Sequence, residues 1–234
     1  MKLSGMMATM LVLALVMTFA GPAAAAGPGV PDPGTIVCTS GLLTVDEEAD
    51  ILYMREEEKV ARDVYLAMYD LWQIDVFATI AESEQRHMDS VLGLIECFEL
   101  IDPVVDDTPG AFTNPDLAAM YTALIDAGTV SGPEALRVGL LIEETDIADL
   151  RAALAATDKV NIIQVYTNLE AGSCNHLRAF YRNLLAAGET YTPQILTQEE
   201  FDEIIDAGLI PSQNRNRHKE PFKFKKQLGL VDDE

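Results

Sequence analysis

The chain has few cysteines, and their spacing argues against the common cysteine-based sites. Only Cys38, Cys97 and Cys174 occur in 234 residues, and none forms a C-x-x-C pair with another. This pattern does not fit a disulfide scaffold, a zinc knuckle or a rubredoxin-like electron-transfer domain. One disulfide in an oxidising compartment and buried free thiols remain open as alternatives.

Positive charge is scarce as well, because 16 Lys and Arg residues face 38 Asp and Glu residues. A chain with a formal net charge of −22 is not expected to bind nucleic acid or anionic membrane surfaces. The exception is a basic tail over residues 212–226, which also holds Phe222 and Phe224. We expect this tail to fold back onto the acidic body. His218 lies within it and is interpreted as a surface residue.

Long apolar runs are missing except near the N-terminus. Lys2 precedes an apolar stretch over residues 6–19, and Ala24-Ala25-Ala26-Gly27 follows as a small-residue cleavage pattern. This arrangement predicts a secretory signal peptide over residues 1–26, because the stretch is too short for a membrane anchor. The mature protein is then secreted or extracytoplasmic, with no membrane insertion. A Pro- and Gly-rich linker over residues 27–42 follows.

The remainder is almost entirely helical in pattern, with no strand pattern of consequence. Long helices are predicted over residues 45–72, 76–100, 134–157 and 159–187. Thr44 with Glu47 reads as a capping box, and Asp75 is the candidate N-cap of the second helix. Short helices are predicted from Asn114-Pro115 to Gly128 and after Thr197.

The link between the second and third long helices is about thirty residues long, which is unusual for a bundle. The prediction is therefore an all-α fold, a ferritin-like four-helix bundle with one long crossover and short accessory helices. The bundle is placed at residues 43–188. Residues 189–234 are assigned to a short C-terminal helix and the basic tail. An oligomer is compatible with this sequence.

Each long helix has one apolar face that is interrupted near its middle by polar residues. Residues spaced alternately by three and four lie on one helical face. The second helix has the face Phe77, Ile80, Glu84, His87, Val91, Leu94, Phe98. The others have the faces Ile51, Met54, Glu58, Ala61, Tyr65, Met68, Trp72; Leu136, Leu140, Glu143, Ile147, Leu150, Leu154; and Ile162, Tyr166, Leu169, Ser173, His176, Phe180.

Antiparallel helices of this length bring their midpoints to one depth, so five candidate metal ligands converge: Glu58, Glu84, His87, Glu143 and His176. Three carboxylates in a core require nearby positive charge, which one or two divalent cations can supply. This oxygen and nitrogen set favours iron or manganese, with zinc less favoured, and argues against copper(I). A register shifted by one would substitute Glu57 or Glu144. Two metal-free interpretations remain open for single residues. Glu58 belongs to a solvent-exposed run of glutamates in one, and His176 is a hydrogen-bonded core histidine in the other.

The run Glu58-Lys59-Val60-Ala61-Arg62-Asp63-Val64-Tyr65 resembles the first ligand helix of rubrerythrin-type ferritin-like proteins, and Glu84-x-x-His87 resembles their second. Segments over roughly residues 43–205 more closely resemble the uncharacterised prokaryotic family named domain of unknown function 2202. These segments are 55–65, 81–89, 143–150, 168–180, 191–193 and 198–202. The ferritin-like resemblance implies a di-iron or di-manganese carboxylate site.

The fourth helix departs from that pattern, because Ser173 stands where a second E-x-x-H would place a glutamate before His176. Glu170 lies about 240° round the helix from His176 and cannot replace it. Water, Cys174, Asp63 or Asp146 are the candidates for compensation.

The leading hypothesis is a secreted ferritin-like metalloprotein with one or two metal ions and dioxygen or peroxide chemistry, in which Tyr65 could relay electrons. No catalytic residue is assigned. A metal-free helical binding or structural module of the cell envelope is the first alternative, and metal sequestration without catalysis is the second.

Overall fold

The computed structural model describes residues 41–207, which contain six α-helices and no strand. In chain order these are α1 (Val45–Trp72), α2 (Asp75–Cys97), α3 (Pro115–Gly128), α4 (Gly132–Ala156), α5 (Val160–Ala186) and α6 (Gln198–Ala207). Every helix expected from the sequence is present, and the fold is an all-α helical bundle. The largest boundary difference is at the end of α2, which stops at Cys97 instead of residue 100.

Short polar residues begin most of the helices as expected. The Thr44 hydroxyl accepts a hydrogen bond from the Glu47 backbone N–H, and the Glu47 carboxylate accepts one from the Thr44 N–H. Asn114 caps α3, and Ser131 caps α4. The prediction that Asp75 is the N-cap of α2 is wrong. Ile74 occupies the extended N-cap position without a side-chain bond, and Asp75 is already inside the first turn.

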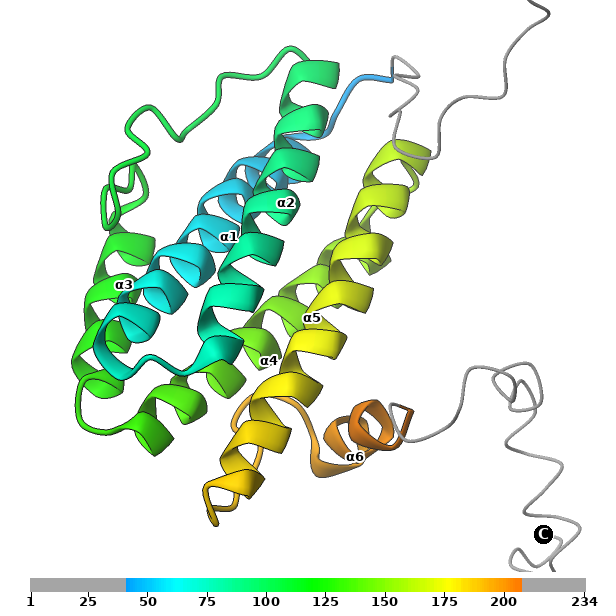
Figure 1. The fold of residues 1–234 in the computed structure, drawn as a ribbon. Helices are drawn as coiled ribbons and strands as arrows, with labels where there is room; N and C mark the ends of the chain where they lie inside the picture. Colours follow the sequence, from blue (N-terminus) through cyan, green and yellow to red (C-terminus); the bar gives the residue numbers. More distant parts are fainter. Residues whose placement is uncertain (1–40, 208–234) are drawn as a thin grey trace, which may run out of the picture. The chain divides into compact units, whose positions relative to one another are not determined.

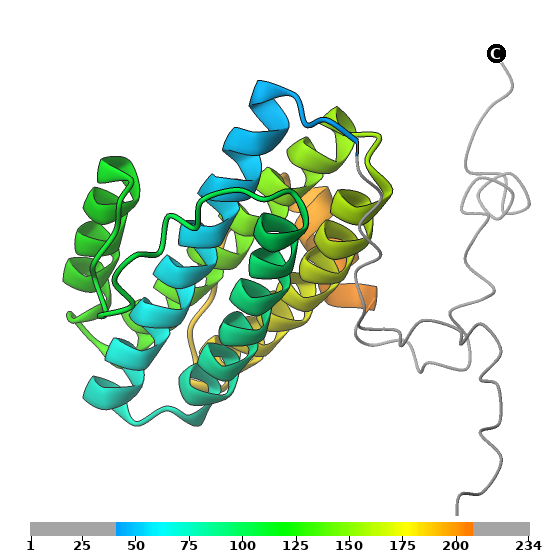
Figure 2. The same ribbon diagram turned by 90° about the horizontal axis from the view of Figure 1, so that it is seen from above.

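The four long helices form two antiparallel hairpins, α1 with α2 and α4 with α5, that pack against each other (Figure 1). Helix α3 packs against α1 and α4 within the connection from α2 to α4, and α6 packs against α5. Seen from above, α3 lies outside the four-helix bundle beside α1 (Figure 2). One long crossover with accessory helices is thus observed.

The crossover is fastened to α1 by buried polar groups. Arg55 donates to the Asp102 carboxylate at 3.1 and 3.0 Å and to the Met88 carbonyl at 2.8 Å. Lys59 donates to the Thr108 carbonyl at 2.9 Å. Since the bundle covers one face of α1 and the crossover covers another, residues 54–65 are buried without a break.

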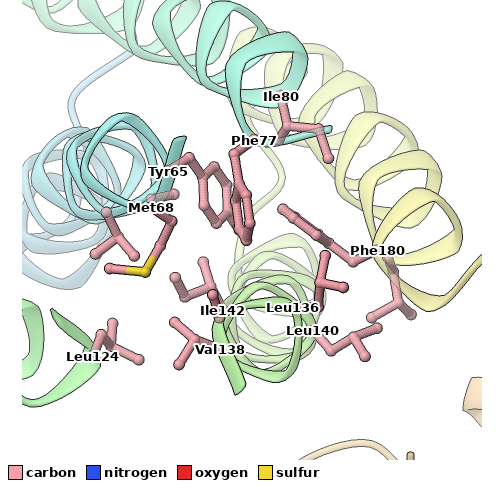
Figure 3. Close-up of a cluster of buried hydrophobic side chains, with 14 of the residues drawn as sticks. Tyr65, Met68, Phe77, Ile80, Leu124, Leu136, Val138, Leu140, Ile142 and Phe180 are labelled. Atoms are coloured by element: carbon pink, nitrogen blue, oxygen red, sulfur yellow. The ribbon is translucent and has the colours of Figure 1, made fainter. Parts of the chain in front are cut away.

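The core consists of two apolar clusters with a polar layer between them. One cluster, shown in part in Figure 3, includes Tyr65, Phe77 and Phe180, whose rings point toward one another from α1, α2 and α5. The other includes Ile51, Val91 and Leu169. The polar layer is built from the middle residues of the four apolar faces. All of the predicted face residues are buried except Trp72, Phe98 and Leu154 at the helix ends, which are half-buried.

Several sequence expectations fall on residues that lie outside the described range. They concern the signal peptide at 1–26, nearly all of the 27–42 linker, Cys38 and the basic tail. Within residues 41–207, no helix is both long enough and apolar enough to cross a bilayer.

Candidate metal centre

The five predicted ligands meet in the polar layer, and we refer to Glu58, Glu84, His87, Glu143 and His176 as the central polar cluster. Each of these residues is at most 8 % exposed. Glu58 comes from α1, Glu84 and His87 from α2, Glu143 from α4, and His176 from α5. Glu84, His87 and His176 alone place one ligand atom each within 4.8 Å of one another.

Glu84 lies at the centre and divides the cluster into two halves. Its Oε2 is 2.8 Å from Nδ1 of His87, which is also 3.3 Å from Oε2 of Glu58. Its Oε1 is 2.9 Å from Nδ1 of His176, which is also 3.4 Å from Oε2 of Glu143. The two imidazole rings stack with centroids 5.3 Å apart. One carboxylate thus spans two similar sets of nitrogen and oxygen atoms.

Most of these close approaches are not hydrogen bonds. Oε1 of Glu58, Oε1 of Glu84 and Nδ1 of His176 are buried without a partner of hydrogen-bonding geometry. Buried polar atoms are rarely left in this state. Two ligand atoms that share a cation at about 2.1 Å lie roughly 3 Å apart. The spacing and the orphaned atoms therefore fit a possible metal site at Glu84, His87 and His176.

Neighbouring glutamates in the sequence have different partners, which supports the predicted register. Glu56 accepts hydrogen bonds from the backbone N–H groups of Thr113 and Asn114 at the start of α3. Glu144 accepts from the Tyr191 hydroxyl at 2.6 Å and from backbone N–H groups of residues 194–196. Both residues hold connecting segments in place, while Glu58 and Glu143 face the cluster.

Ser173 brings a carboxylate to the place where the ferritin-like pattern has a glutamate. Its buried hydroxyl is hydrogen-bonded to Oδ2 of Asp146 and lies 2.9 Å from the Leu169 carbonyl. Oδ1 of Asp146 is buried without a hydrogen-bond partner. Of the four candidates for compensation, Asp146 is therefore the one that the geometry favours.

The other two candidate side chains, Asp63 and Cys174, are poorer metal ligands. Asp63 accepts from Lys59 at 2.6 Å and from Arg62 at 2.8 Å. Cys174 is a half-buried free thiol, and burial raises its pKa to about 11. Cys97, by contrast, is disulfide-bonded.

Packing fixes the orientation of the ligands. A Cβ atom on Gly172 would lie 2.5 Å from Nε2 of His87, so only glycine leaves room for this ring. The Tyr65 hydroxyl donates to Oε1 of Glu143 at 2.6 Å, and the Tyr65 ring packs on Phe180 with centroids 5.0 Å apart. The side chains that support the ligands are therefore themselves held rigidly.

Electrostatic coupling within the cluster is strong. Burial opposes the charge of the imidazoles, yet the facing carboxylates raise the pKa of His87 to about 12 and that of His176 to about 10. Burial would also raise the pKa of Glu84, but His176 and His87 outweigh it and lower that pKa to about 2. Burial, with help from Glu84 and Glu143, raises the pKa of Glu58 to about 7.

Two further carboxyl groups adjoin the cluster, and burial is the main cause that raises the pKa of both Glu57 and Asp146 well above the usual range. Together with Glu58, Glu84 and Glu143 they make five buried carboxyl groups. Two imidazolium ions can balance only two of the five charges. Without a metal the remainder must take up protons, whereas divalent cations can balance them directly.

A cavity of about 330 Å³ opens beside the cluster. Its polar wall consists of the same five carboxyl groups. The rest of its lining comes from α1, α3, α4 and the segment before α6, and is mostly apolar: Val60, Ala61, Met120, Leu124, Leu141, Ile142, Thr145 and Ile195. The candidate centre is therefore accessible to a small molecule.

Comparison with known proteins identifies the family. Residues 47–208 match the model of the family described as "Uncharacterized protein domain (DUF2202)". The chain belongs to the DUF2202 family. This agrees with the resemblance noted from the sequence segments.

One relative of this DUF2202 protein is the "Uncharacterized protein MJ0754" of Methanocaldococcus jannaschii. The two are 46 % identical over 173 residues, covering 74 % of this chain and 94 % of the relative. The crystal structure of hypothetical protein MJ0754 is also similar, with a TM-score of 0.70 over 71 % of this chain and 95 % of that one. Neither description assigns an activity.

Sequence reasoning missed two features of this DUF2202 site. Gly172 lies next to Ser173, but nothing in a single sequence shows that a ring from α2 will press on it. Glu57 was considered only as a substitute for Glu58, although it lines the cavity in its own right. Asp146 is among the candidates from the sequence, and it lies three residues after Glu143 on the same face of the helix.

Proposed function

We propose that the central polar cluster binds two divalent transition-metal ions, either iron or manganese, and that this protein is a redox-active metalloprotein. The observation that carries the proposal is the position of Glu84. Its two carboxylate oxygens face two separate imidazole nitrogens, each with a second carboxylate beside it. One metal would be held by Glu58, Glu84 and His87, and the other by Glu84, Glu143 and His176.

The donor atoms support the choice of metal. Carboxylate and imidazole ligands suit iron and manganese, and zinc is less favoured. The free thiol of Cys174 is not among the cluster's ligand atoms, so soft copper(I) is not expected. Two iron ions in such a site would supply one-electron redox chemistry toward dioxygen or peroxide.

The protein itself would position the ligands and limit access. Tyr65 holds Glu143 in place by donating to its Oε1, and Gly172 lets His87 approach α5. Apolar clusters lie on either side of the cluster, and the cavity opens beside it. Because of the predicted signal peptide at residues 1–26, we place this chemistry outside the cytoplasm.

Metal analysis of protein purified without a tag, before and after reconstitution with iron, manganese or zinc, tests the proposal. We expect two ions per chain in the wild type, and losses in Glu84→Ala and His176→Ala. Glu82→Ala is the matched control, because Glu82 is exposed on the same helix as Glu84. A wild-type stoichiometry well below one per chain after reconstitution would overturn the proposal.

One observation favours a metal-free structural module instead, which is the ion pair between His87 and Glu58 at 3.3 Å. The excess of buried carboxyl groups weighs against it, since two imidazoles cannot balance five acids. The two functions differ in their response to a chelator. A metalloprotein loses thermal stability when EDTA is added, whereas the metal-free module does not.

Metal sequestration without catalysis would give the same stoichiometry and the same chelator response. Turnover assays with hydrogen peroxide and with ferrous iron separate it from redox catalysis. We expect turnover that Glu84→Ala abolishes. Metal binding without any turnover would favour sequestration.

A further inference from the structure

A pocket separate from the metal centre lies at the end of the bundle where α1 begins, α4 ends and α5 begins (Figure 1). It measures about 200 Å³. An apolar cavity of about 150 Å³ holds benzene, so this space suits a molecule of roughly six to nine non-hydrogen atoms. Asp50, which lines the pocket, precedes Glu58 by eight residues on α1, which is about 12 Å along the helix.

Two aspartates of α1 that line this pocket lack a positively charged partner. Asp46 is exposed and Asp50 is half-buried, so both side chains reach water. Within residues 41–207, neither carboxylate takes part in an ion pair or a side-chain hydrogen bond. Burial raises the pKa of Asp50, and the neighbouring carboxylates raise it further: Asp46, Asp149 and Glu47. The pocket thus has an excess of negative charge, which a bound cation would relieve.

The third carboxylate of the pocket and the adjacent lysine are already engaged. Oε1 of Glu47 accepts a hydrogen bond from the Thr157 hydroxyl at 2.7 Å, and its Oε2 accepts one from the Thr44 backbone N–H at 2.8 Å. Nζ of Lys159 lies 2.9 Å from Oδ1 of Asp158 and 3.7 Å from Oε1 of Glu47. Neither side chain is left to bind the two aspartates.

A buried tyrosine adds an unpartnered hydroxyl to the same pocket. Tyr166 lines the pocket from α5 and is 1 % exposed. Its hydroxyl has no hydrogen-bond partner, which is rare for a buried polar group. After burial, the charge of Asp50 is the largest cause that raises the pKa of this hydroxyl, so the two groups lie close together.

The number and kind of these oxygen atoms indicate which cation fits. Ca²⁺ takes roughly six to eight oxygen ligands, and a single ion would fill only a small part of the space. An ammonium group instead has three N–H donors and no acceptor. The two aspartates and the Tyr166 hydroxyl offer three acceptors. Beside them Ala153, Ala156 and Ile162 form an apolar wall that suits a hydrocarbon chain.

We propose that this pocket binds a small primary amine in its ammonium form, with a short apolar chain of about six carbon atoms. The ammonium group donates to Asp46, Asp50 and Tyr166, and the chain lies against Ala153 and Ile162. The site lies apart from the central polar cluster, and the inference does not depend on bound metal.

Calorimetric titration with hexan-1-amine, hexan-1-ol and hexanoate tests the proposal, because the three probes share chain length and differ in their polar end. We expect saturable binding of the amine at one site per chain, and binding at least about tenfold weaker for the other two. An equal concentration of calcium chloride should not displace the amine. Alcohol binding as tight as that of the amine, displacement by calcium, or no saturable amine binding would overturn the proposal.

Variants locate the site. Asp50→Asn should weaken amine binding by at least about tenfold, while Asp70→Asn, exposed on the same helix, should leave it unchanged. Ala153→Phe fills the pocket and should abolish amine binding, whereas Ala152→Phe, exposed on the same turn, should not. If Ala153→Phe does not fold, Ala156→Phe fills the same space. Unchanged amine binding in Asp50→Asn or in a folded filling variant would refute the inference.

Tyr166→Phe separates ligand binding from folding. It removes a hydroxyl that has no partner in the free protein, so the free energy of unfolding should not fall. Amine affinity should fall by about tenfold, because a hydrogen bond to a charged group is lost. Reduced stability with unchanged amine affinity would show that the hydroxyl does not contact the ligand.

Metal content measured on the same samples separates this inference from the proposed function. Asp50→Asn should retain its metal, and Glu84→Ala should still bind hexan-1-amine. A wild-type chain that binds the amine but retains no metal after reconstitution would remove the metalloprotein proposal alone. A chain that retains two metal ions but does not bind the amine would remove the amine site alone.

Discussion

At the scale of the residue, the role of a side chain depends less on its chemical type than on the direction in which it points from the helix. Glu56, Glu57 and Glu58 are three identical side chains in a row, and all are buried. Each is rotated by about 100° from the last, so they face the start of α3, the cavity and the central polar cluster respectively. The three-four spacing of the apolar face predicts Glu58, Glu143 and His176 as candidate metal ligands because it follows this rotation.

Substitutions in this run should separate stability from metal binding. Glu56→Gln removes one of two acceptors for backbone N–H groups, and should lower the free energy of unfolding by about 1–3 kcal/mol without changing metal stoichiometry. Glu58→Gln should weaken metal binding by at least about tenfold. Urea denaturation and metal titration measure the two effects. Metal loss in Glu56→Gln as large as in Glu58→Gln would refute this division.

Gly172→Ala should disturb the site through His87. Alanine gains up to about 1 kcal/mol of helix propensity over glycine, but its Cβ would press into a buried imidazole ring. We therefore expect metal affinity to fall by about tenfold, as for other losses of ligand support. Ala171→Ser, exposed on the same turn, is the control. Unchanged metal affinity in Gly172→Ala, measured by competition with a chelator, would show that His87 is not a ligand.

At the scale of the element, the helices followed from capping residues and apolar periodicity. The capping boxes at Thr44 and Thr197 and the Asn-Pro start of α3 are present as expected. Asp75 failed as a cap because the two-residue link after Trp72 lets Ile74 take the extended position first. What periodicity could not show is how the crossover is held. Arg55 and Lys59 lie off the apolar face, and their partners Asp102 and Thr108 lie in a connection without helical periodicity.

The crossover should loosen when its fastening is removed. Arg55→Met removes the paired hydrogen bonds to Asp102, and leaves that half-exposed carboxylate without its cation. We expect a loss of about 1–3 kcal/mol in the free energy of unfolding, with faster amide exchange over residues 99–114. Arg86→Met, exposed on α2, should change neither. Unaltered exchange in the Arg55 variant would contradict this role for the residue.

At the scale of the whole molecule, buried side chains of the metal-free protein carry protons at the positions where metal cations would bind. In the folded state the pKa of Glu58 is raised to about 7, and those of His87 and His176 to about 12 and 10. Each of these groups binds its proton more tightly in the folded chain than in the unfolded chain. The depressed pKa of Glu84 acts in the opposite direction, but only in acid solution.

Stability of the metal-free protein should therefore fall as the pH rises. The contribution of the two histidines is fully present below their unfolded pKa of 6.5, and is lost progressively as the pH rises toward their folded values of about 12 and 10. The raised Glu58 pKa acts in the same direction between its ordinary value of 4.5 and about 7. Circular dichroism melting in EDTA should give a lower midpoint at pH 8 than at pH 6.

Bound metal should reverse the pH dependence of stability, because the cations must displace the protons on His87 and His176. Metal binding should therefore tighten with rising pH and release protons, which titration in buffers of different ionisation enthalpy can count. A metal-free melting midpoint that rises between pH 6 and pH 8 would contradict the assignment of these histidines as protonated.

The buried stretch of α1 over residues 54–65 has a consequence for how the protein tolerates change. An ordinary bundle helix offers a solvent face on which almost any side chain is accepted, so its tolerance to substitution repeats every 3.6 residues. In residues 54–65 of α1, the core, the polar layer and the crossover together cover every side of the helix. A saturation scan of these twelve positions should show no such repeat, with Arg55 and Lys59 as resistant to replacement as Val60 and Val64.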